Sequence, residues 1–103
     1  MTPEEIGLPA QAVESIRQVF SRFPGIEQAV LYGSRAKGNF RAGSDIDMTL
    51  KGDLNYRDLL NIELALDDLL LPWKIDLSLY AQIDNPALVE HIGRVGKALY
   101  VKG

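Results

Sequence analysis

Two aspartates separated by a single residue, Asp45 and Asp47, open an apolar stretch of the sequence. On a β-strand, residues at i and i+2 point to the same face, so their carboxylates would lie close enough to share one or two hard cations. Mg²⁺ takes oxygen ligands and is commonly held by one or two carboxylates together with substrate phosphates. The spacing therefore predicts a site for Mg²⁺ and a phosphorylated ligand.

A Gly33-Ser34 pair stands at the end of the apolar run 29–32, and a ten-residue spacer separates it from Asp45. A turn at this point can offer backbone N–H groups and a hydroxyl to the phosphates of the same ligand. The alternative is an ordinary strand-to-helix turn in which Ser34 caps the helix, and the two interpretations are compatible. We therefore expect Gly33 and Ser34 to bind a nucleotide.

Three basic residues follow the turn and could neutralise the β- and γ-phosphates of that nucleotide. Arg35 is the first candidate because it lies next to the turn and because a guanidinium group matches the geometry of a phosphate. Lys37 and Arg41 come later in the same segment. For each of the three, the alternative is a solvated basic loop.

A third carboxylate, Asp76, is flanked by Ile75 and Leu77 in another apolar segment. An ionised carboxylate in an apolar strand needs a partner or a metal ion, which favours a functional interpretation. The alternative is an aspartate at a strand end that accepts hydrogen bonds from a nearby turn.

The Gly33-Ser34 pair, the spacer and the Asp45-x-Asp47 motif resemble the signature of the polymerase-beta-like nucleotidyltransferases. The small size resembles the minimal nucleotidyltransferases, and the resemblance runs over roughly residues 8–100. It implies that Asp45, Asp47 and Asp76 hold two Mg²⁺ ions and carry the catalysis, with ATP as the substrate. It also implies that Ser34 contacts the triphosphate. Whether Asp76 deprotonates the acceptor or no general base exists stays open, as does the choice of base among the nucleoside triphosphates.

Larger relatives in this family add a helical domain for the second substrate, and we expect this chain to build its acceptor site with another protein. The resemblance to the minimal nucleotidyltransferases implies that this partner is a small helical HEPN protein and that the two form a toxin–antitoxin pair. The enzyme would move AMP from ATP to a tyrosine hydroxyl of the toxin and silence it. The alternative is a catalytically weak or inactive nucleotide-binding module that neutralises its partner by contact alone.

Composition narrows the class of protein. The 103 residues are predicted to form one nucleotidyltransferase domain, 1–103. A net charge of −3 argues against a broad nucleic-acid surface. The absence of cysteine excludes disulfides and cysteine-ligated zinc, and it is compatible with a cytoplasmic protein. We expect no signal peptide and no membrane span, because no apolar run approaches the roughly 20 residues that a span needs.

Apolar periodicity and turn residues predict alternating helices and strands. The expected helices are 8–23, 34–37, 55–71 and 86–95, and the expected strands are 26–32, 45–51, 74–80 and 97–102. This order indicates an α+β fold with a small mixed sheet and helices packed on one face, like a nucleotidyltransferase palm. His91 is interpreted as part of a solvated helix face, and Trp73 as packing at the edge of the core.

Overall fold

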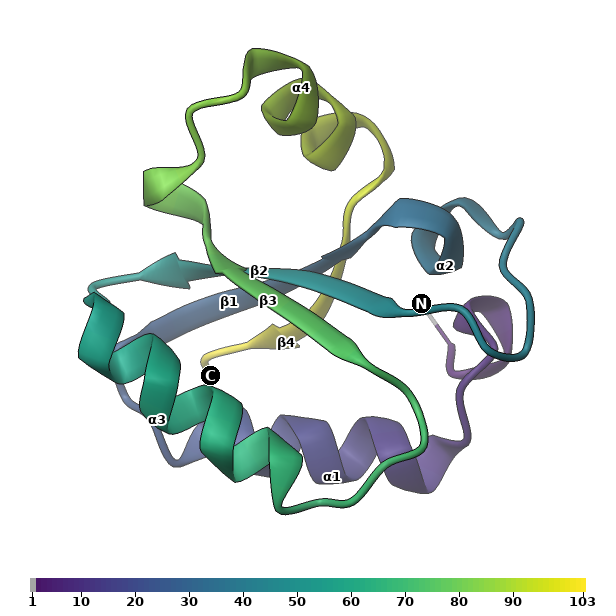
Figure 1. The fold of residues 1–103 in the computed structure, drawn as a ribbon, viewed down its shortest axis with the longest axis horizontal. Helices are drawn as coiled ribbons and strands as arrows, with labels where there is room; N and C mark the ends of the chain where they lie inside the picture. The colour runs from purple at the N-terminus through teal and green to yellow at the C-terminus, as the bar shows by residue number, and fades with distance from the viewer. Residues whose placement is uncertain (1) are drawn as a thin grey trace.

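The computed structural model describes residues 2–103, which form a four-stranded mixed sheet flanked by helices (Figure 1). The strands are β1 (Ile26–Tyr32), β2 (Ile46–Gly52), β3 (Ile75–Leu79) and β4 (Lys97–Val101). The helices are α1 (Ala10–Ser21), α2 (Gly33–Lys37), α3 (Tyr56–Asp67) and α4 (Pro86–Val95), with short 3-10 helices η1 (Glu4–Ile6) and η2 (Tyr80–Gln82). The predicted alternation and the α+β class are confirmed.

The strand order in the sheet is β3-β2-β1-β4. β1 lies in the middle and pairs antiparallel with both β2 and β4, whereas β2 and β3 run parallel. A parallel pair needs a long crossover, and α3 supplies it between β2 and β3.

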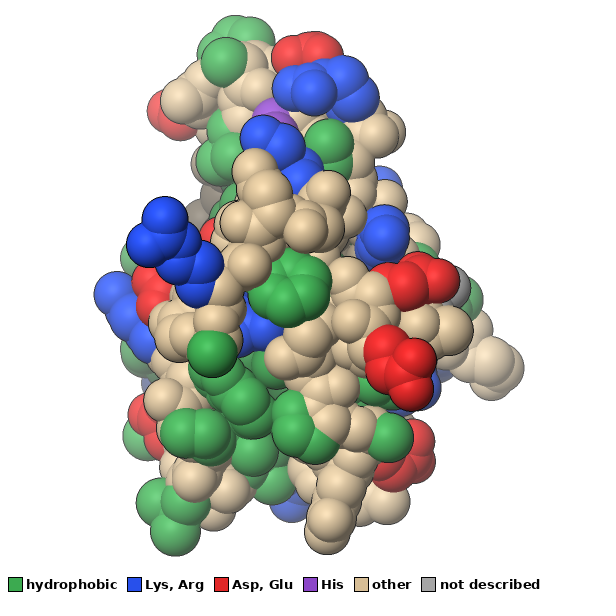
Figure 2. Space-filling view, turned by 90° about the vertical axis from the view of Figure 1, so that its right-hand side faces the viewer, with side chains coloured by type: hydrophobic (Ala, Val, Ile, Leu, Met, Phe, Trp, Pro, Cys, Tyr) green, Lys and Arg blue, Asp and Glu red, His purple; other side chains and the backbone are tan. Residues whose placement is uncertain are grey.

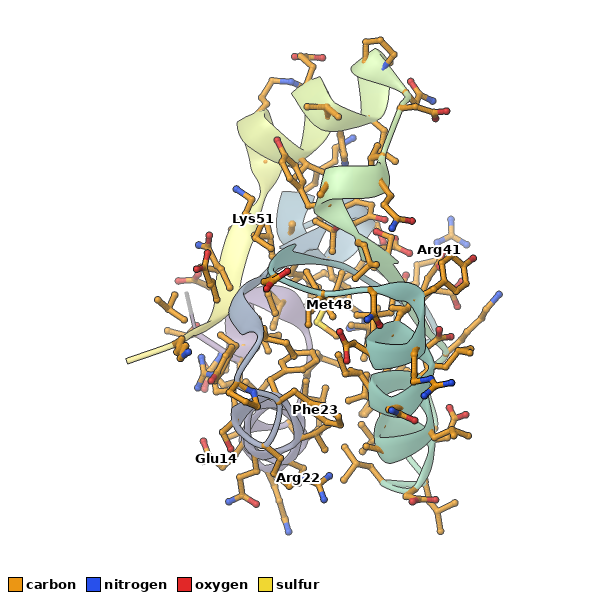
Figure 3. All side chains as sticks on the ribbon, turned by 90° about the vertical axis from the view of Figure 1, so that its left-hand side faces the viewer. Glu14, Arg22, Phe23, Arg41, Met48 and Lys51 are labelled. Atoms are coloured by element: carbon orange, nitrogen blue, oxygen red, sulfur yellow. The ribbon has the colours of Figure 1, made fainter. Side chains whose placement is uncertain are left out.

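The hydrophobic core lies between the sheet and a layer formed by α1 and α3 (Figure 1). Alternate residues along each strand point into it, because side chains on a strand face opposite sides in turn. Figure 3 shows this alternation on β2, where Met48 is directed towards the two helices and Lys51 lies on the other side of the sheet. The helices contribute buried residues at helical spacing, namely Val13, Ile16 and Phe20 from α1 and Leu59, Ile62 and Leu66 from α3.

The ends of α3 follow from local chemistry. A capping box begins the helix, since the Asn55 side chain accepts the Asp58 N–H and the Asp58 side chain accepts the Asn55 N–H. The helix ends at Asp67, four residues before the predicted end at Leu71. Leu70 adopts a left-handed conformation with φ of 54°, and the residue before Pro72 is disfavoured in a helix. These two features stop the apolar periodicity from continuing as helix.

α4 lies on the opposite side of the sheet from α1 and α3 (Figure 1). Asn85 caps its start by accepting the N–H groups of Ala87 and Leu88, and Pro86 occupies the first turn. Gly96, directly after the helix, lies so close to Val30 of β1 that a Cβ would overlap it. The expectation of helices on one face therefore holds for the two long helices α1 and α3, while α4 borders the open face. None of the helices in residues 2–103 has the length and apolar character needed to cross a bilayer.

Candidate active site

The open face of the sheet carries one row of polar side chains across three strands. Asp47 on β2 is paired with Tyr32 on β1 and with Asp76 on β3. These residues face away from the core because their neighbours Leu31, Met48 and Leu77 face into it. Asp45 stands just before β2, two residues from Asp47, and is exposed. The sheet thus places Asp47 and Asp76 on one face, and Asp45 lies near enough to raise the pKa of Asp47.

The electrostatic state of Asp47 reflects this gathering. Burial raises the pKa of Asp47 above its ordinary value, and the negative charges of Asp76 and Asp45 raise it further. Lys74 and His91 act in the opposite direction and lower it. Burial and the neighbouring carboxylates together outweigh this effect, and a bound cation would relieve both.

The donor chemistry of this face fits Mg²⁺. The three carboxylates offer only oxygen atoms, which are the ligands that hard divalent cations take. Asp45 and Asp76 are exposed, so their side chains are free to turn about their backbone positions. Within residues 2–103, no three His, Cys, Asp or Glu side chains are already drawn together into a metal cluster. The assignment of Asp45, Asp47 and Asp76 as metal ligands stays a prediction.

The turn between β1 and α2 packs directly against Asp47. Gly33 has φ of 74°, and a Cβ at this position would overlap Oδ2 of Asp47. Only glycine combines this backbone conformation with such a close approach. The predicted nucleotide-binding turn and the predicted metal carboxylate are therefore neighbours.

Ser34 does not cap α2, so that part of the sequence prediction is wrong. The helix begins one residue earlier, at Gly33, and its N-cap is Tyr32, whose side chain makes no capping hydrogen bond. Ser34 lies inside the first turn and is half-buried. A nucleotide contact by Gly33 and Ser34 remains a prediction.

Arg35 corrects a second expectation, since its side chain cannot reach a phosphate in this arrangement. The residue has 0% relative exposure. Its guanidinium donates five hydrogen bonds to four backbone carbonyls, those of Ile6, Gly7, Ala42 and Ser44. A guanidinium has five N–H donors, so none is left for a nucleotide. Proximity to the turn in sequence suggested a contact that the inward direction of the side chain prevents.

Lys37 and Arg41 are both exposed. Figure 2 views the molecule from the side of α2 and shows Lys and Arg side chains around the upper half of this face, with hydrophobic side chains gathered below. Lys37 and Arg41 therefore present positive charge to solvent near α2, whereas Arg35 does not.

His91 is the functional candidate that the sequence interpretation missed. Its Nε2 accepts the Gly33 N–H at 3.2 Å, and its ring meets the Tyr32 ring edge-on at 6.2 Å. It is half-buried, unlike the solvated helix face that was expected. One signal could have identified it: His91 lies at helical spacing from Leu88 and Val95, on the stripe that α4 turns towards the sheet.

A polar network adjoins the carboxylates. Burial raises the pKa of the Tyr32 hydroxyl, the neighbouring Ser78 side chain lowers it, and the charges of Asp47 and Asp76 raise it again. The Ser78 hydroxyl in turn donates to Thr49 Oγ1 at 2.9 Å, and Thr49 has 0% exposure. Tyr32 therefore stays protonated at neutral pH, and it lies beside the hydrogen-bonded pair Ser78 and Thr49.

Comparison with known proteins gives one family and several related structures. Residues 14–103 match the family model described as polymerase beta, nucleotidyltransferase. A chain of a toxin–antitoxin structure with AMP-PNP superposes with a TM-score of 0.70 and 20% sequence identity, over 87% of this chain and 73% of that one. No curated protein matches this chain significantly in sequence.

Two further complexes contain chains of the same fold. One is a tri-AMPylated Shewanella oneidensis HEPN toxin with MNT antitoxin, matched with a TM-score of 0.65 and 18% identity over 89% of this chain and 71% of that one. The other is the toxin–antitoxin MntA-HepT, matched with a TM-score of 0.66 and 18% identity over 91% and 74%. At these identities the likeness establishes a shared fold.

Proposed function

Because the chain belongs to the polymerase beta nucleotidyltransferase family, we propose that it transfers AMP from ATP to a hydroxyl group of a partner HEPN toxin and so acts as an antitoxin. The observation that carries this proposal is the row of Tyr32, Asp47 and Asp76, against which the Gly33 turn packs. Carboxylates for a metal ion and a turn for phosphates are then side by side, as nucleotidyl transfer requires.

Five of the six predicted site residues have a role in this proposal, all except Arg35. Asp45, Asp47 and Asp76 hold Mg²⁺, which when bound neutralises charge on the phosphates and on the attacking oxygen. Gly33 and Ser34 contact the triphosphate through the backbone and the hydroxyl. The acceptor oxygen attacks the α-phosphorus, the bond to pyrophosphate breaks, and pyrophosphate leaves. Asp76, the exposed member of the row, is the candidate to take the hydroxyl proton.

The proposed partner rests on the related complexes, and the proposed acceptor residue rests on the family resemblance. One of them contains an AMP-modified HEPN toxin beside an MNT antitoxin, and another contains AMP-PNP. We extend this arrangement to the present chain and propose a tyrosine of the toxin as the acceptor.

The test is the intact mass of the partner that co-purifies with the tagged chain, measured before and after incubation with Mg²⁺ and ATP. The proposal expects a gain of one or more AMP units with the wild type and no gain with Asp47→Asn. Asp53→Asn is the matched control, because Asp53 is an exposed carboxylate just beyond the far end of β2. A partner whose mass stays unchanged with wild-type protein and Mg²⁺–ATP would overturn the proposal.

The contact-only alternative predicts a different result in the same system. If the chain only covers its partner, Asp47→Asn neutralises the toxin as well as the wild type does. If AMP transfer is required, toxicity returns with Asp47→Asn and stays suppressed with Asp53→Asn. Toxicity of the partner in living cells therefore separates the two functions.

A further inference from the structure

Arg35 is a buried cation whose charge is matched by backbone carbonyls instead of a carboxylate. Burying a charge is costly unless it is fully hydrogen-bonded. The five hydrogen bonds to Ile6, Gly7, Ala42 and Ser44, at 2.9–3.2 Å, meet this requirement. A side chain that binds four backbone carbonyls at once holds the segments that carry those carbonyls in place.

Two aromatic rings complete the surroundings of the guanidinium. Its central carbon lies 5.4 Å from the Phe40 ring centre and 5.7 Å from the Trp73 ring centre. Such cation–π contacts are strongest when they are shielded from water, as they are here. Trp73 also donates its indole N–H to the Ala42 carbonyl at 3.0 Å, so the ring and the guanidinium hold the same loop.

The carbonyls that Arg35 binds belong to two separate segments. Ile6 and Gly7 lie at the end of η1, outside the residues 14–103 that match the family model. Ala42 and Ser44 lie in the loop that leads into β2, and Ser44 directly precedes Asp45. Arg35 itself stands two residues after Gly33. One side chain thus joins the turn, the loop before the carboxylates and the N-terminal segment.

Ser44 is the point at which this network meets the carboxylates. Its carbonyl accepts two hydrogen bonds from Arg35, at 2.9 and 3.1 Å, and its hydroxyl accepts the Arg41 N–H at 2.8 Å. Because Ser44 is bonded directly to Asp45, the position of its backbone constrains the position of the Asp45 backbone. Asp47 follows two residues later, so the same constraint extends to its position.

We propose that Arg35 is a positioning residue, which acts through Ser44 to set Asp45 and Asp47 relative to the Gly33 turn and which makes η1 part of the scaffold of the site. This inference rests on the proposed function, in which Asp45 and Asp47 are metal ligands. A lysine cannot take over this role, because one ammonium group lacks the planar fork that spans four carbonyls. Arg35 touches no substrate, so its effect reaches the reaction only through the geometry of the carboxylates.

The experiment compares wild type, Arg35→Lys and the exposed-surface control Arg57→Lys at a temperature at which circular dichroism shows all three folded. Backbone amide NMR spectra without metal are recorded first, and Mn²⁺ affinity is measured second. We expect Arg35→Lys to shift the amide signals of Ile6, Gly7, Asp45 and Asp47. We also expect it to weaken Mn²⁺ binding by roughly 10-fold or more, as loss of a group that orients metal ligands does. Arg57→Lys is expected to change neither.

A milder variant keeps the test usable if Arg35→Lys does not fold. Phe40→Leu removes one of the two rings beside the guanidinium and leaves its hydrogen bonds in place, so the same signals should shift by less. Amide changes confined to residues 2–8 and 40–43, with Mn²⁺ affinity equal to that of the wild type, would overturn the inference. A wild type that does not bind Mn²⁺ would count against the proposed function, and the amide signals of Asp45 and Asp47 would then decide the role of Arg35.

Discussion

Replacing Gly33 by alanine has two consequences that the structure allows to be separated. The first is backbone strain, because φ at this position is 74° and an L-residue is held there in the left-handed region. That conformation costs about 1–2 kcal/mol. For a domain of this size, such a loss lowers the Tm by about 4–16 °C.

The second consequence concerns Asp47. The new Cβ would overlap Oδ2, which is the far end of a flexible side chain, so the carboxylate rotates away and the backbone stays in place. A displacement of about 1 Å in a group that holds the reacting atoms can cost about 100-fold in rate. Under the proposed function, we expect kcat/KM for AMP transfer to fall by about that factor in Gly33→Ala.

Gly38→Ala is the matched control. Gly38 ends α2 with φ of 87°, so alanine is strained there too, but no atom lies within 4 Å of its Cβ position. Thermal denaturation should show similar losses of Tm for the two variants. AMP transfer, measured at a temperature at which both are folded, should be strongly reduced only in Gly33→Ala. Equal activity of the two variants would refute the reasoning, because strain alone would then explain both.

Three further predictions concern stability and the surroundings of the site. Burial and neighbouring carboxylates raise the pKa of Asp47 above 3.8, so the folded protein binds this proton more tightly than the unfolded chain, and metal-free stability falls as the pH rises through the interval above 3.8. Asp47→Asn should therefore raise the Tm at neutral pH in EDTA, with the gain vanishing below pH 3.8; a gain that is independent of pH would contradict this. His91→Ala removes the acceptor of the Gly33 N–H, which should cost about 1 kcal/mol and about 4–8 °C in Tm and should raise KM for ATP. His91→Gln keeps an acceptor, so its Tm and its KM for ATP should stay close to those of the wild type. Equal defects in the two variants would argue against the hydrogen bond. Asn55→Ala breaks the capping box of α3, which should cost about 1 kcal/mol and about 4–8 °C in Tm, while AMP transfer stays unchanged because α3 covers the other face of the sheet.

The elements of this fold were predictable because their signals are local. Short apolar runs bounded by turn residues indicated β1 and β2, and helical spacing indicated α1 and α3. The same-face relation of Asp45 and Asp47 follows from two-residue spacing alone. The ends of helices were less predictable, since the stop at Asp67 depends on a left-handed Leu70 that no periodicity reveals.

Contacts between distant segments escaped the sequence prediction. His91 and Gly33 are 58 residues apart and meet only because α4 borders the open face. The pairing of Asp76 with Asp47 depends on the parallel register of β3 with β2, which local patterns do not specify, and only the family resemblance placed Asp76 in the site. Arg35 was predicted to bind the nucleotide because the adjacent Gly33 and Ser34 were predicted to do so. The direction of its side chain is instead determined by the carbonyls of Ile6 and Gly7, which no spacing rule connects to it.

The partners of Arg35 also bear on how the site keeps its charge. Had the guanidinium paired with Asp45 or Asp47, it would have neutralised the carboxylate that a cation must meet, and the metal would have had to displace it. All five donors go to uncharged carbonyls instead, so Arg35 supplies rigidity without compensating the acids. Asp47 is left with a pKa raised by burial and by neighbouring carboxylates, which destabilises the fold in metal-free solution. A divalent cation that binds here would recover this lost stability, and the recovered free energy would add to its affinity. For the same reason, Asp47→Asn is expected to stabilise the fold while it abolishes AMP transfer.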